Sequence, residues 1–387
     1  MPKTVTTKYA GIKMSDAKKT ESERKNSSSG SDYNSDSDSM FSEPIEIKFT
    51  KPLAAMVIGN SMLSAVKGVS AAGATPEDTL FTPNLDARLI LSGTEEGKEV
   101  PVSPLGCVSP AVVVHALFGM CGIEPVVVNA GLVHRPDFVC TDIYGEVGQD
   151  PRFDFALKDP RLLYKRGVKV GTQWGTYADL LILGECVPGG TTTALCVMKA
   201  LGYNVSASSS FPVSPTALKE EICNAVLKRI RDAGVDTKDA FEVMRYAGDP
   251  MMPVVCGIVR GFREANRKRG SVGNIVLSGG TQMLSVCALI KAIGDGMPPF
   301  ITTKYVRDDK SAAIEEGIRQ IGAKCIFVDP HFENIGIPPL ERYCKGEVKE
   351  GTIFGGSILL AHLLGYSEEE IRTAIRDFMI NAMSHTF

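Results

Sequence analysis

The amino-acid sequence predicts an α/β protein with a doubly wound, mainly parallel (Rossmann-like) sheet and a smaller helical subdomain. Short segments that are apolar on both faces alternate with amphipathic helical segments, as expected when helices cover both faces of a parallel sheet. Several of the helical segments also begin with a recognisable start signal. The candidate strands are Leu53–Ile58, Pro125–Asn129, Leu180–Gly184, Asn274–Leu277 and Cys325–Val328.

Capping residues mark the expected helix starts. In three places a Ser or Asp stands directly before a proline, and proline suits the first helical turn because its missing N–H is not needed there. Before the last helix, Ser367 and Glu370 form the S-x-x-E pattern of a capping box. The three proline pairs are Ser109-Pro110, Ser214-Pro215 and Asp249-Pro250.

Composition indicates one large folded domain after an N-terminal extension. The chain has 387 residues, of which 44% are hydrophobic and 22% charged, which are ordinary values for a globular protein. The stretch Asn26–Ser42 is rich in Ser and Asp and is too polar to bury a core. We therefore expect residues 1–45 to be a disordered extension and residues 46–387 to form the domain, whose terminal segments supply the helical subdomain.

Charge and residue spacing argue against several functional classes. The net charge of −3 provides no basic field for nucleic acid, and no apolar run is long enough to span a membrane. The ten cysteines form no C-x-x-C pair and the five histidines show no ligand spacing, so we expect no metal site. These features predict a cytoplasmic protein that acts on small molecules.

Two glycine-containing loops are candidate phosphate sites, because each joins a predicted strand to a helix. Glycine lets an anion approach the free N–H groups of a helix start, and hydroxyl side chains add donors. Neither loop is a G-x-x-x-x-G-K-[ST] phosphate loop, and each alone is also compatible with a simple tight turn. The candidate binding residues are Gly189, Gly190, Thr191 and Thr192 in the first loop and Ser278, Gly279 and Gly280 in the second.

Two glutamates are candidate catalytic residues. Glu185 ends a predicted strand inside the first glycine loop, where a carboxylate would repel phosphate, so it suits ribose hydroxyls or a positively charged ring. Glu350 stands just before the apolar helix 353–364. The pattern alone also fits a residue that only stabilises the positive end of that helix.

Beyond these residues, the sequence resembles the nicotinate-nucleotide–dimethylbenzimidazole phosphoribosyltransferase family, in the branch typical of archaea and cyanobacteria. The resemblance spans roughly residues 53–382. The better-known bacterial pattern has an asparagine where this chain has Gly190. The strings that carry the resemblance are Gly184-Glu185, Pro188-Gly189-Gly190-Thr191-Thr192-Thr193, Leu201-Gly202-Tyr203, Gly59-Asn60-Ser61, Gly68-Val69-Ser70-Ala71-Ala72-Gly73, Phe81-Thr82-Pro83, Gly248-Asp249-Pro250-Met251, Ser278-Gly279-Gly280-Thr281 and Glu350-Gly351-Thr352.

The resemblance implies transfer of phosphoribose from nicotinate mononucleotide to a lower-ligand base such as 5,6-dimethylbenzimidazole, in cobamide nucleotide-loop assembly. It implies Glu350 as the general base, with Glu185 near the ribose and the charged ring. It also implies that Asp249, Gly351 and Thr352 lie at the substrate, that no cofactor is required and that the protein is a homodimer. The identity of the acceptor base stays open.

Two alternatives also stay open at this point: a non-catalytic nucleotide-binding protein of the same fold, and a hydrolase that replaces the base with water. An apolar slot for a flat ring, for which Met62, Leu63 and Phe81 are candidates, would argue against the hydrolase. Leu63 is better suited to filling the core.

Overall fold

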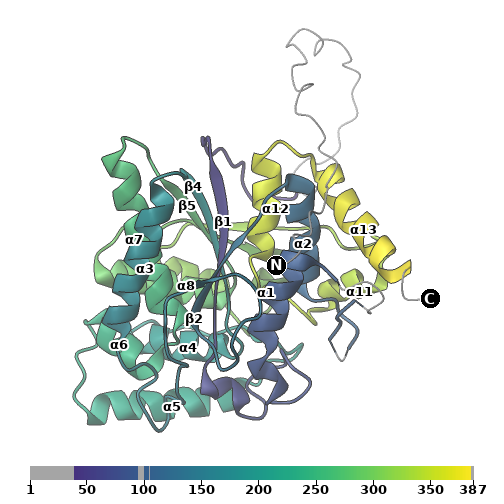
Figure 1. The fold of residues 1–387 in the computed structure, drawn as a ribbon. Helices are drawn as coiled ribbons and strands as arrows, with labels where there is room; N and C mark the ends of the chain where they lie inside the picture. Colours follow the sequence, from purple (N-terminus) through teal and green to yellow (C-terminus); the bar gives the residue numbers. More distant parts are fainter. Residues whose placement is uncertain (1–38, 95–99, 104, 385–387) are drawn as a thin grey trace, which may run out of the picture. The chain divides into compact units, whose positions relative to one another are not determined.

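The computed structural model describes residues 39–94, 100–103 and 105–384, which form a doubly wound α/β domain (Figure 1). Its seven strands build one sheet in the order β3-β2-β1-β4-β5-β6-β7, and each neighbouring pair is parallel. The fold class predicted from the sequence is confirmed. The strands are β1 (Pro52–Gly59), β2 (Val126–Gly131), β3 (Thr141–Asp142), β4 (Leu180–Cys186), β5 (Asn274–Ser278), β6 (Phe300–Thr303) and β7 (Cys325–Val328).

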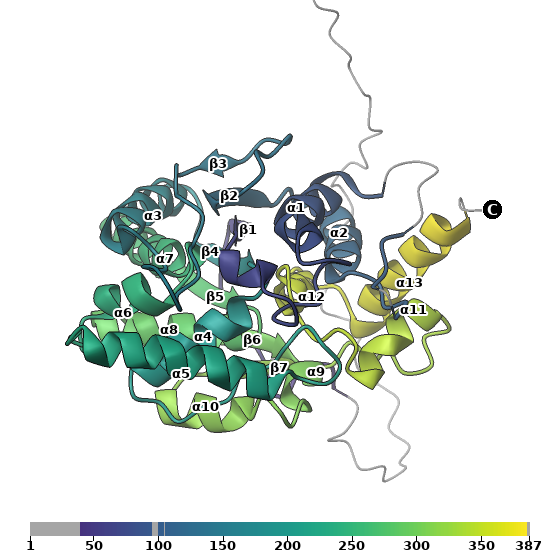
Figure 2. The same cartoon turned by 90° about the horizontal axis from the view of Figure 1, so that it is seen from below.

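Helices cover both faces of the sheet (Figure 2). One face packs against α3 (Pro160–Gly175), α4 (Gly190–Ala200), α5 (Thr216–Asp232), α6 (Ala240–Ala247), α7 (Met251–Lys268), α8 (Thr281–Ile293) and α10 (Ile314–Ile321). The other packs against α1 (Thr82–Ser92), α2 (Pro110–Cys121), α11 (Pro338–Glu341), α12 (Phe354–Leu363) and α13 (Glu368–Ser384). The short α9 (Lys304–Arg307) follows β6 at once.

Strand β1 shows why a continuous apolar segment predicts a strand of a doubly covered sheet. Its residues alternate between two separate cores, with Leu53, Ala55 and Val57 on one face and Ala54, Met56 and Ile58 on the other. Side chains of a strand point to opposite faces in turn, so a strand covered on both sides has no polar positions.

The predicted helix starts are mostly confirmed. The Ser109 side chain accepts from the Ala111 N–H at the start of α2, and Ser367 and Glu370 form the capping box of α13. The Ser214 prediction is wrong, because α5 begins at Thr216 and the Ser214 hydroxyl makes no capping bond. The apolar stripe of the last helix serves the core, because Ile371, Ile375 and Met379 are buried.

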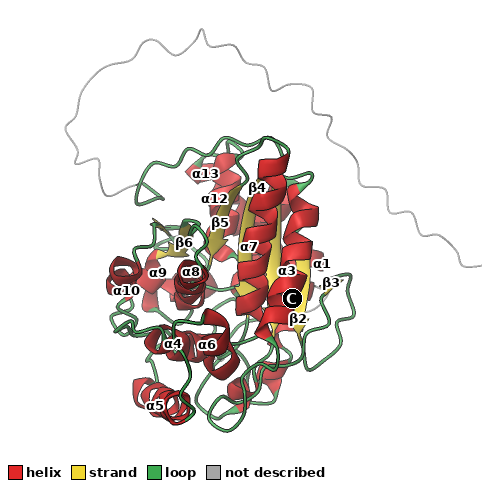
Figure 3. Cartoon of the chain, turned by 90° about the vertical axis from the view of Figure 1, so that its left-hand side faces the viewer, coloured by secondary structure: helices red, strands yellow, loops and turns green. Residues whose placement is uncertain are grey.

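Helices α3 and α7 run side by side across one face of the sheet with their backbones in contact (Figure 3). Glycines one helical turn apart permit this approach. A Cβ at Gly167 would lie 2.3 Å from the Val254 carbonyl oxygen, and one at Gly257 would lie 2.1 Å from that of Tyr164. No described helix is both long and apolar enough to cross a membrane.

The folded domain begins before residue 46. The expected extension falls outside the described residues over 1–38, but residues 39–45 are described and continue the sheet edge beside β7. Phe41 forms an antiparallel bridge with Val328, and the Asp329 N–H donates to the Met40 carbonyl at 2.7 Å. Met40 and Phe41 are apolar residues within an otherwise polar stretch, and both are buried in the core beneath α12 and α13.

We expect Phe41→Ala and Met40→Ala each to lower the free energy of unfolding by roughly 2–5 kcal/mol, because each removes a buried side chain. Urea denaturation followed by circular dichroism measures this loss. Glu43→Ala is the matched control, since its carboxylate makes only an exposed ion pair with Lys324. Equal stability of all three variants would show that this segment is not part of the core.

Candidate active site

A cavity of about 510 Å³ opens beyond the carboxyl ends of β4 and β5. This is the edge at which ligands bind in open α/β sheets, because loops there lead into helix N-termini. The cavity is lined by residues from segments 70–73, 82–86, 101–110, 185–191, 208–212, 280–282 and 347–352.

The structure brings together most of the site residues predicted from the sequence. The predicted residues that line the cavity are Glu185, Gly189, Thr191, Gly280, Glu350, Gly351 and Thr352. The remaining ones, Gly190, Thr192, Ser278, Gly279 and Asp249, lie behind the cavity wall. Both glutamates and both glycine loops therefore meet at one place.

The residues behind the wall have structural contacts. Ser278 accepts a hydrogen bond from the Gly356 N–H at 2.8 Å and so holds the start of α12 against β5. Gly190 faces Gln282, and a Cβ at Gly190 would lie 2.1 Å from the Gln282 amide nitrogen. Asp249 accepts from the Met251 N–H at 3.1 Å, which makes it first a cap of α7.

The turn that carries Glu350 is fastened directly to β4. The Thr352 N–H donates to the Glu185 carbonyl oxygen at 3.2 Å. Ile353 packs against Gly184 so closely that a Cβ on Gly184 would lie 2.5 Å from the Ile353 Cβ. Thr352 and Ile353 have φ angles of 52° and 68°. This left-handed conformation costs a β-branched residue about 1–3 kcal/mol, so the surrounding contacts must hold the turn in place.

Burial makes the two glutamates unusually basic. It raises the pKa of Glu185 to about 8, with a further contribution from the carboxylate of Asp249, while the hydrogen bond from the Val187 N–H opposes the shift. Burial also raises the pKa of Glu350 to about 8, although hydrogen bonds from backbone N–H groups such as that of Gly355 lower it. Glu350 Oε2 is buried without a hydrogen-bond partner among the described residues. A ligand carrying a positive charge or an N–H would satisfy this pair.

The Gln282 side chain positions Glu185. Its amide nitrogen donates to Glu185 Oε2 at 2.8 Å and to the Val187 carbonyl oxygen at 3.2 Å. Gln282 stands in the first turn of α8 and lines the cavity. Glu185 is therefore held between the ends of β4 and β5 rather than free to swing.

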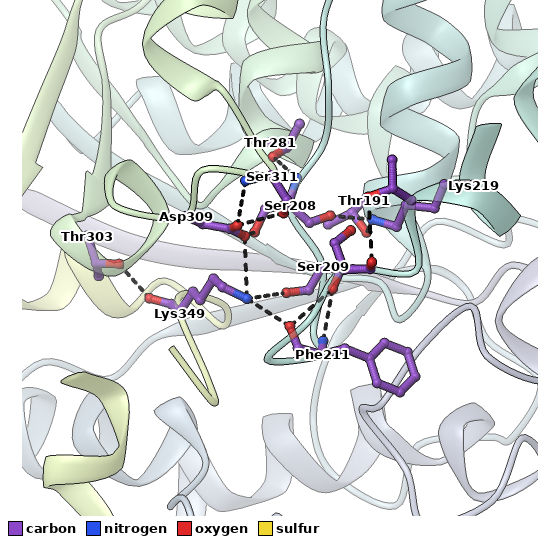
Figure 4. Close-up of polar contacts among 12 residues, drawn as sticks. Thr191, Ser208, Ser209, Phe211, Lys219, Thr281, Thr303, Asp309, Ser311 and Lys349 are labelled. Atoms are coloured by element: carbon purple, nitrogen blue, oxygen red, sulfur yellow. Dashed lines mark hydrogen bonds and ion pairs between the residues drawn. The ribbon is translucent and has the colours of Figure 1, made fainter. Parts of the chain in front are cut away.

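Two buried lysines hold the segment 208–211, which lines another part of the cavity (Figure 4). Lys219, which is 1% exposed, donates to the Thr191 hydroxyl at 2.8 Å and to the Ser208 carbonyl. Lys349 donates to the carbonyl oxygens of Ser209 and Phe211 at 3.1 and 2.8 Å. Burial lowers the pKa of Lys219 to about 7 and also lowers that of Lys349.

Asp309 connects this wall to the start of α8. Its Oδ2 accepts from the Ser208 hydroxyl at 2.9 Å and lies 3.4 Å from Lys349 Nζ. The Ser208 N–H in turn donates to the Thr281 hydroxyl at 3.0 Å (Figure 4). The segment 208–211 is thus tied to α8 through Thr281 and to α4 through Thr191. The two lysines outnumber the single Asp309 carboxylate, and they stand beside two helix N-termini, so this region is suited to an anion.

A third part of the cavity is apolar. Its wall includes Leu85, Pro101, Val102, Leu105, Cys107 and Pro110, with the carboxyl group of Asp86 among them. The candidates Met62, Leu63 and Phe81 do not line this cavity. Leu63 is fully buried in the core, and Phe81 stacks on His134 with ring centroids 3.7 Å apart.

Asp329, His331 and Glu333 form a separate cluster beyond β7, with ligand-type atoms within 4.8 Å of one another. Lys304 Nζ forms an ion pair with Asp329 at 2.7 Å and another with Glu333. The ammonium group supplies the positive charge that would otherwise come from a metal ion.

The chain is similar to known proteins over most of its length. It is 37% identical to a UPF0284 protein of Thermococcus gammatolerans over 330 residues, which are 83% of this chain and 96% of that protein. It is 34% identical to a UPF0284 protein of Methanosarcina mazei over 335 residues, which are 84% of this chain and 94% of that one. No protein-family model matches the chain.

Among solved structures, the chain is similar to CobT from Thermus thermophilus, with a TM-score of 0.52 and 14% identity over 86% of this chain and 84% of that one. Another structure from the same organism, described as a nicotinate-nucleotide-dimethylbenzimidazole phosphoribosyltransferase, also has a TM-score of 0.52 and 14% identity, over 85% and 83% of the two chains. The family resemblance seen in the sequence is thereby confirmed at the level of the fold.

The buried glutamates predict an unusual pH dependence of stability. The folded protein keeps Glu185 and Glu350 protonated up to a pKa of about 8, whereas their ordinary value is 4.5. The stability that these two groups contribute to the free energy of unfolding is fully present below pH 4.5 and is lost as the pH rises through about 8. We expect the urea midpoint to fall over this range, and Glu350→Gln to reduce the fall and be more stable than the wild type at about pH 8.5.

The exposed Glu77→Gln is the matched control and should follow the wild-type curve. Parallel wild-type and Glu350→Gln curves from about pH 5 to about pH 8.5 would show that Glu350 is not held protonated by the fold.

Proposed function

The chain belongs to the UPF0284 family, and we propose that it is a phosphoribosyltransferase that moves phosphoribose from nicotinate mononucleotide to an aromatic nitrogen base. The products are nicotinate and a ribosyl base phosphate, with inversion at the anomeric carbon. The similar solved structure bears the name of this activity. At 14% identity that likeness shows the fold, so the case for function depends on the residues of the cavity.

The observation that carries the proposal is the separation of charge in the cavity. Glu185 and Glu350 form an acidic region. Elsewhere in the cavity, Lys349 lines the wall and pairs with Asp309, and Lys219 lies behind the wall with its ammonium group bonded to the Thr191 hydroxyl. Nicotinate mononucleotide has a matching pattern, because its glycosidic pyridine nitrogen carries a formal positive charge and its phosphate is an anion. The cationic ring suits the glutamates, and the phosphate suits the starts of α4 and α8 near Thr191.

The reaction breaks the bond between the anomeric carbon and the pyridine nitrogen, whose electron pair leaves with nicotinate. A nitrogen of the acceptor base forms the new bond to the same carbon. That nitrogen gives up its proton, and Glu350 is the group that takes it, as its unpartnered Oε2 can accept an N–H. Glu185 stabilises the positive charge that develops on the ribose in the transition state.

The raised pKa of each glutamate fits these roles. In the free protein most Glu350 side chains are protonated at neutral pH, because the pKa is about 8. A cationic ring bound beside the carboxyl groups favours their ionised forms, so binding of the donor prepares the general base.

The apolar wall also favours transfer to a base over hydrolysis. A flat aromatic ring buries well against Leu85, Val102, Leu105 and Pro110, whereas water as acceptor needs no such surface. The residues that line this part of the cavity are therefore the natural place for the second substrate.

We expect Glu350→Gln to lower turnover by about 10²–10⁴-fold while nicotinate mononucleotide still binds, because only proton removal is lost. Nicotinate release and the new glycoside are followed by mass spectrometry, with donor binding measured by calorimetry. In the wild type, kcat/KM should rise with pH up to about 8, the pKa of the free Glu350 side chain.

The control is Glu77→Gln, which should keep wild-type turnover. Unchanged turnover in Glu350→Gln would exclude its role as the general base. Nicotinate release without any acceptor base would instead identify a hydrolase, and binding with no release under any condition would identify a non-catalytic binding protein.

We expect Lys219→Met to weaken nicotinate mononucleotide by at least about tenfold, because the variant removes a buried positive charge next to Thr191. Nicotinate riboside, which lacks the phosphate, should be affected little. Lys199→Met is the matched control, since Lys199 is on α4 but pairs with Glu220. An equal loss for both ligands would show that Lys219 acts on the fold and not on the phosphate.

A further inference from the structure

Asp86 is a carboxyl group placed within the apolar part of the cavity. It lies on α1 and lines the cavity beside Leu85, Pro101, Val102, Leu105 and Pro110. An apolar surface alone would suffice to bury a purely hydrocarbon ring. A carboxylate in such a place is costly unless something donates hydrogen bonds to it.

The protein satisfies Asp86 only in part. Its Oδ1 accepts from the Ser109 hydroxyl at 3.0 Å. The one described partner of its Oδ2 is the thiol of Cys186, at 3.6 Å. A thiol is a weak donor. No described lysine or arginine forms an ion pair with Asp86, so no described residue neutralises its charge.

The ionisation state of Asp86 makes it an acceptor. Burial raises its pKa to about 6, while the hydrogen bonds from Ser109 and Cys186 oppose the shift. At neutral pH the group is therefore mostly a carboxylate. A ligand that places an O–H or N–H at Oδ2 gains a charge-assisted hydrogen bond, and a ligand that places a methyl group there leaves the charge buried and unpaired.

We infer that Asp86 selects an acceptor base that carries a hydrogen-bond donor, an amino or hydroxyl group, on the ring remote from its reacting nitrogen. The base is then a hydroxylated or aminated bicyclic azole or a purine such as adenine, and 5,6-dimethylbenzimidazole is a poor substrate. This inference rests on the proposed function and names the acceptor class of the same site. Asp86 acts on specificity, whereas Glu350 acts on the reacting nitrogen.

The test compares two bases that differ in one group, 5-hydroxybenzimidazole and 5-methylbenzimidazole, with saturating nicotinate mononucleotide. Sites built to hydrogen-bond a hydroxyl reject the analogue without it strongly, so we expect kcat/KM to favour the hydroxyl compound by about 10²-fold or more. Equal values, or a preference for the methyl compound, would overturn the inference while leaving the transferase intact. Absence of transfer to any base would instead refute the proposed function.

Two variants separate recognition from folding. Asp86→Leu should lose most turnover with 5-hydroxybenzimidazole and keep or improve it with the methyl compound, thereby reversing the preference. Ser109→Ala removes the partner of Oδ1 and a cap of α2 but leaves the carboxylate, so it should keep the wild-type preference. If Ser109→Ala abolished the preference as Asp86→Leu does, Asp86 would act only by holding α2.

A binding measurement keeps the inference testable if Asp86→Leu does not fold. Asp86→Asn preserves the shape of the side chain and removes its charge. We expect it to reduce the hydroxyl-over-methyl ratio of base affinities by at least about tenfold, measured by calorimetry with nicotinate present. A ratio that is the same in wild type and Asp86→Asn would overturn the role of the carboxylate.

Discussion

The candidate active site depends on one contact, the docking of the turn 350–353 against the end of β4. The Thr352 N–H bonds to the Glu185 carbonyl, and Ile353 occupies the space that Gly184 leaves free. This contact joins residues that are far apart in the chain and brings the two glutamates into one cavity. It also offsets the left-handed conformations of Thr352 and Ile353, which the isolated segment would not adopt. The strings Gly184-Glu185 and Glu350-Gly351-Thr352 are therefore one structural unit.

Around this contact the fold divides charge between two regions. Carboxyl groups collect where β4 meets α12, and ammonium groups collect where the segment 208–211 meets α4 and α8. In each region burial disfavours the charged form of the side chains. This is why the pKa values of Glu185 and Glu350 are raised and that of Lys219 is lowered. A ligand with a cationic ring and a phosphate favours the ionised forms of both. Binding such a ligand thus exchanges protons at both regions, and affinity is coupled to pH through groups that include the two proposed catalytic residues.

Local patterns predicted much of the fold and only part of the site. The alternation of apolar segments found β1, β2, β4, β5 and β7, but β3 and β6 were missed because they are short and carry few apolar residues. Both catalytic candidates were visible because each stands beside glycines at a strand or helix end. Lys219, Lys349 and Asp86 were missed, since neighbouring residues give no local sign that tertiary packing will place a lysine or an aspartate at a cavity or in the core. Phe41 was missed for the opposite reason, as it lies in a stretch too polar to suggest a core.

The difference at Gly190 shows how the site tolerates a change in its own motif. The better-known pattern has an asparagine at this position, and a side chain there has no room in this protein, because its Cβ would lie 2.1 Å from the Gln282 amide nitrogen. Gln282 enters the same space from α8 and donates to Glu185 at 2.8 Å. The amide beside Glu185 therefore comes from the first turn of α8, and the Gln282 side chain fills the space that Gly190 leaves free.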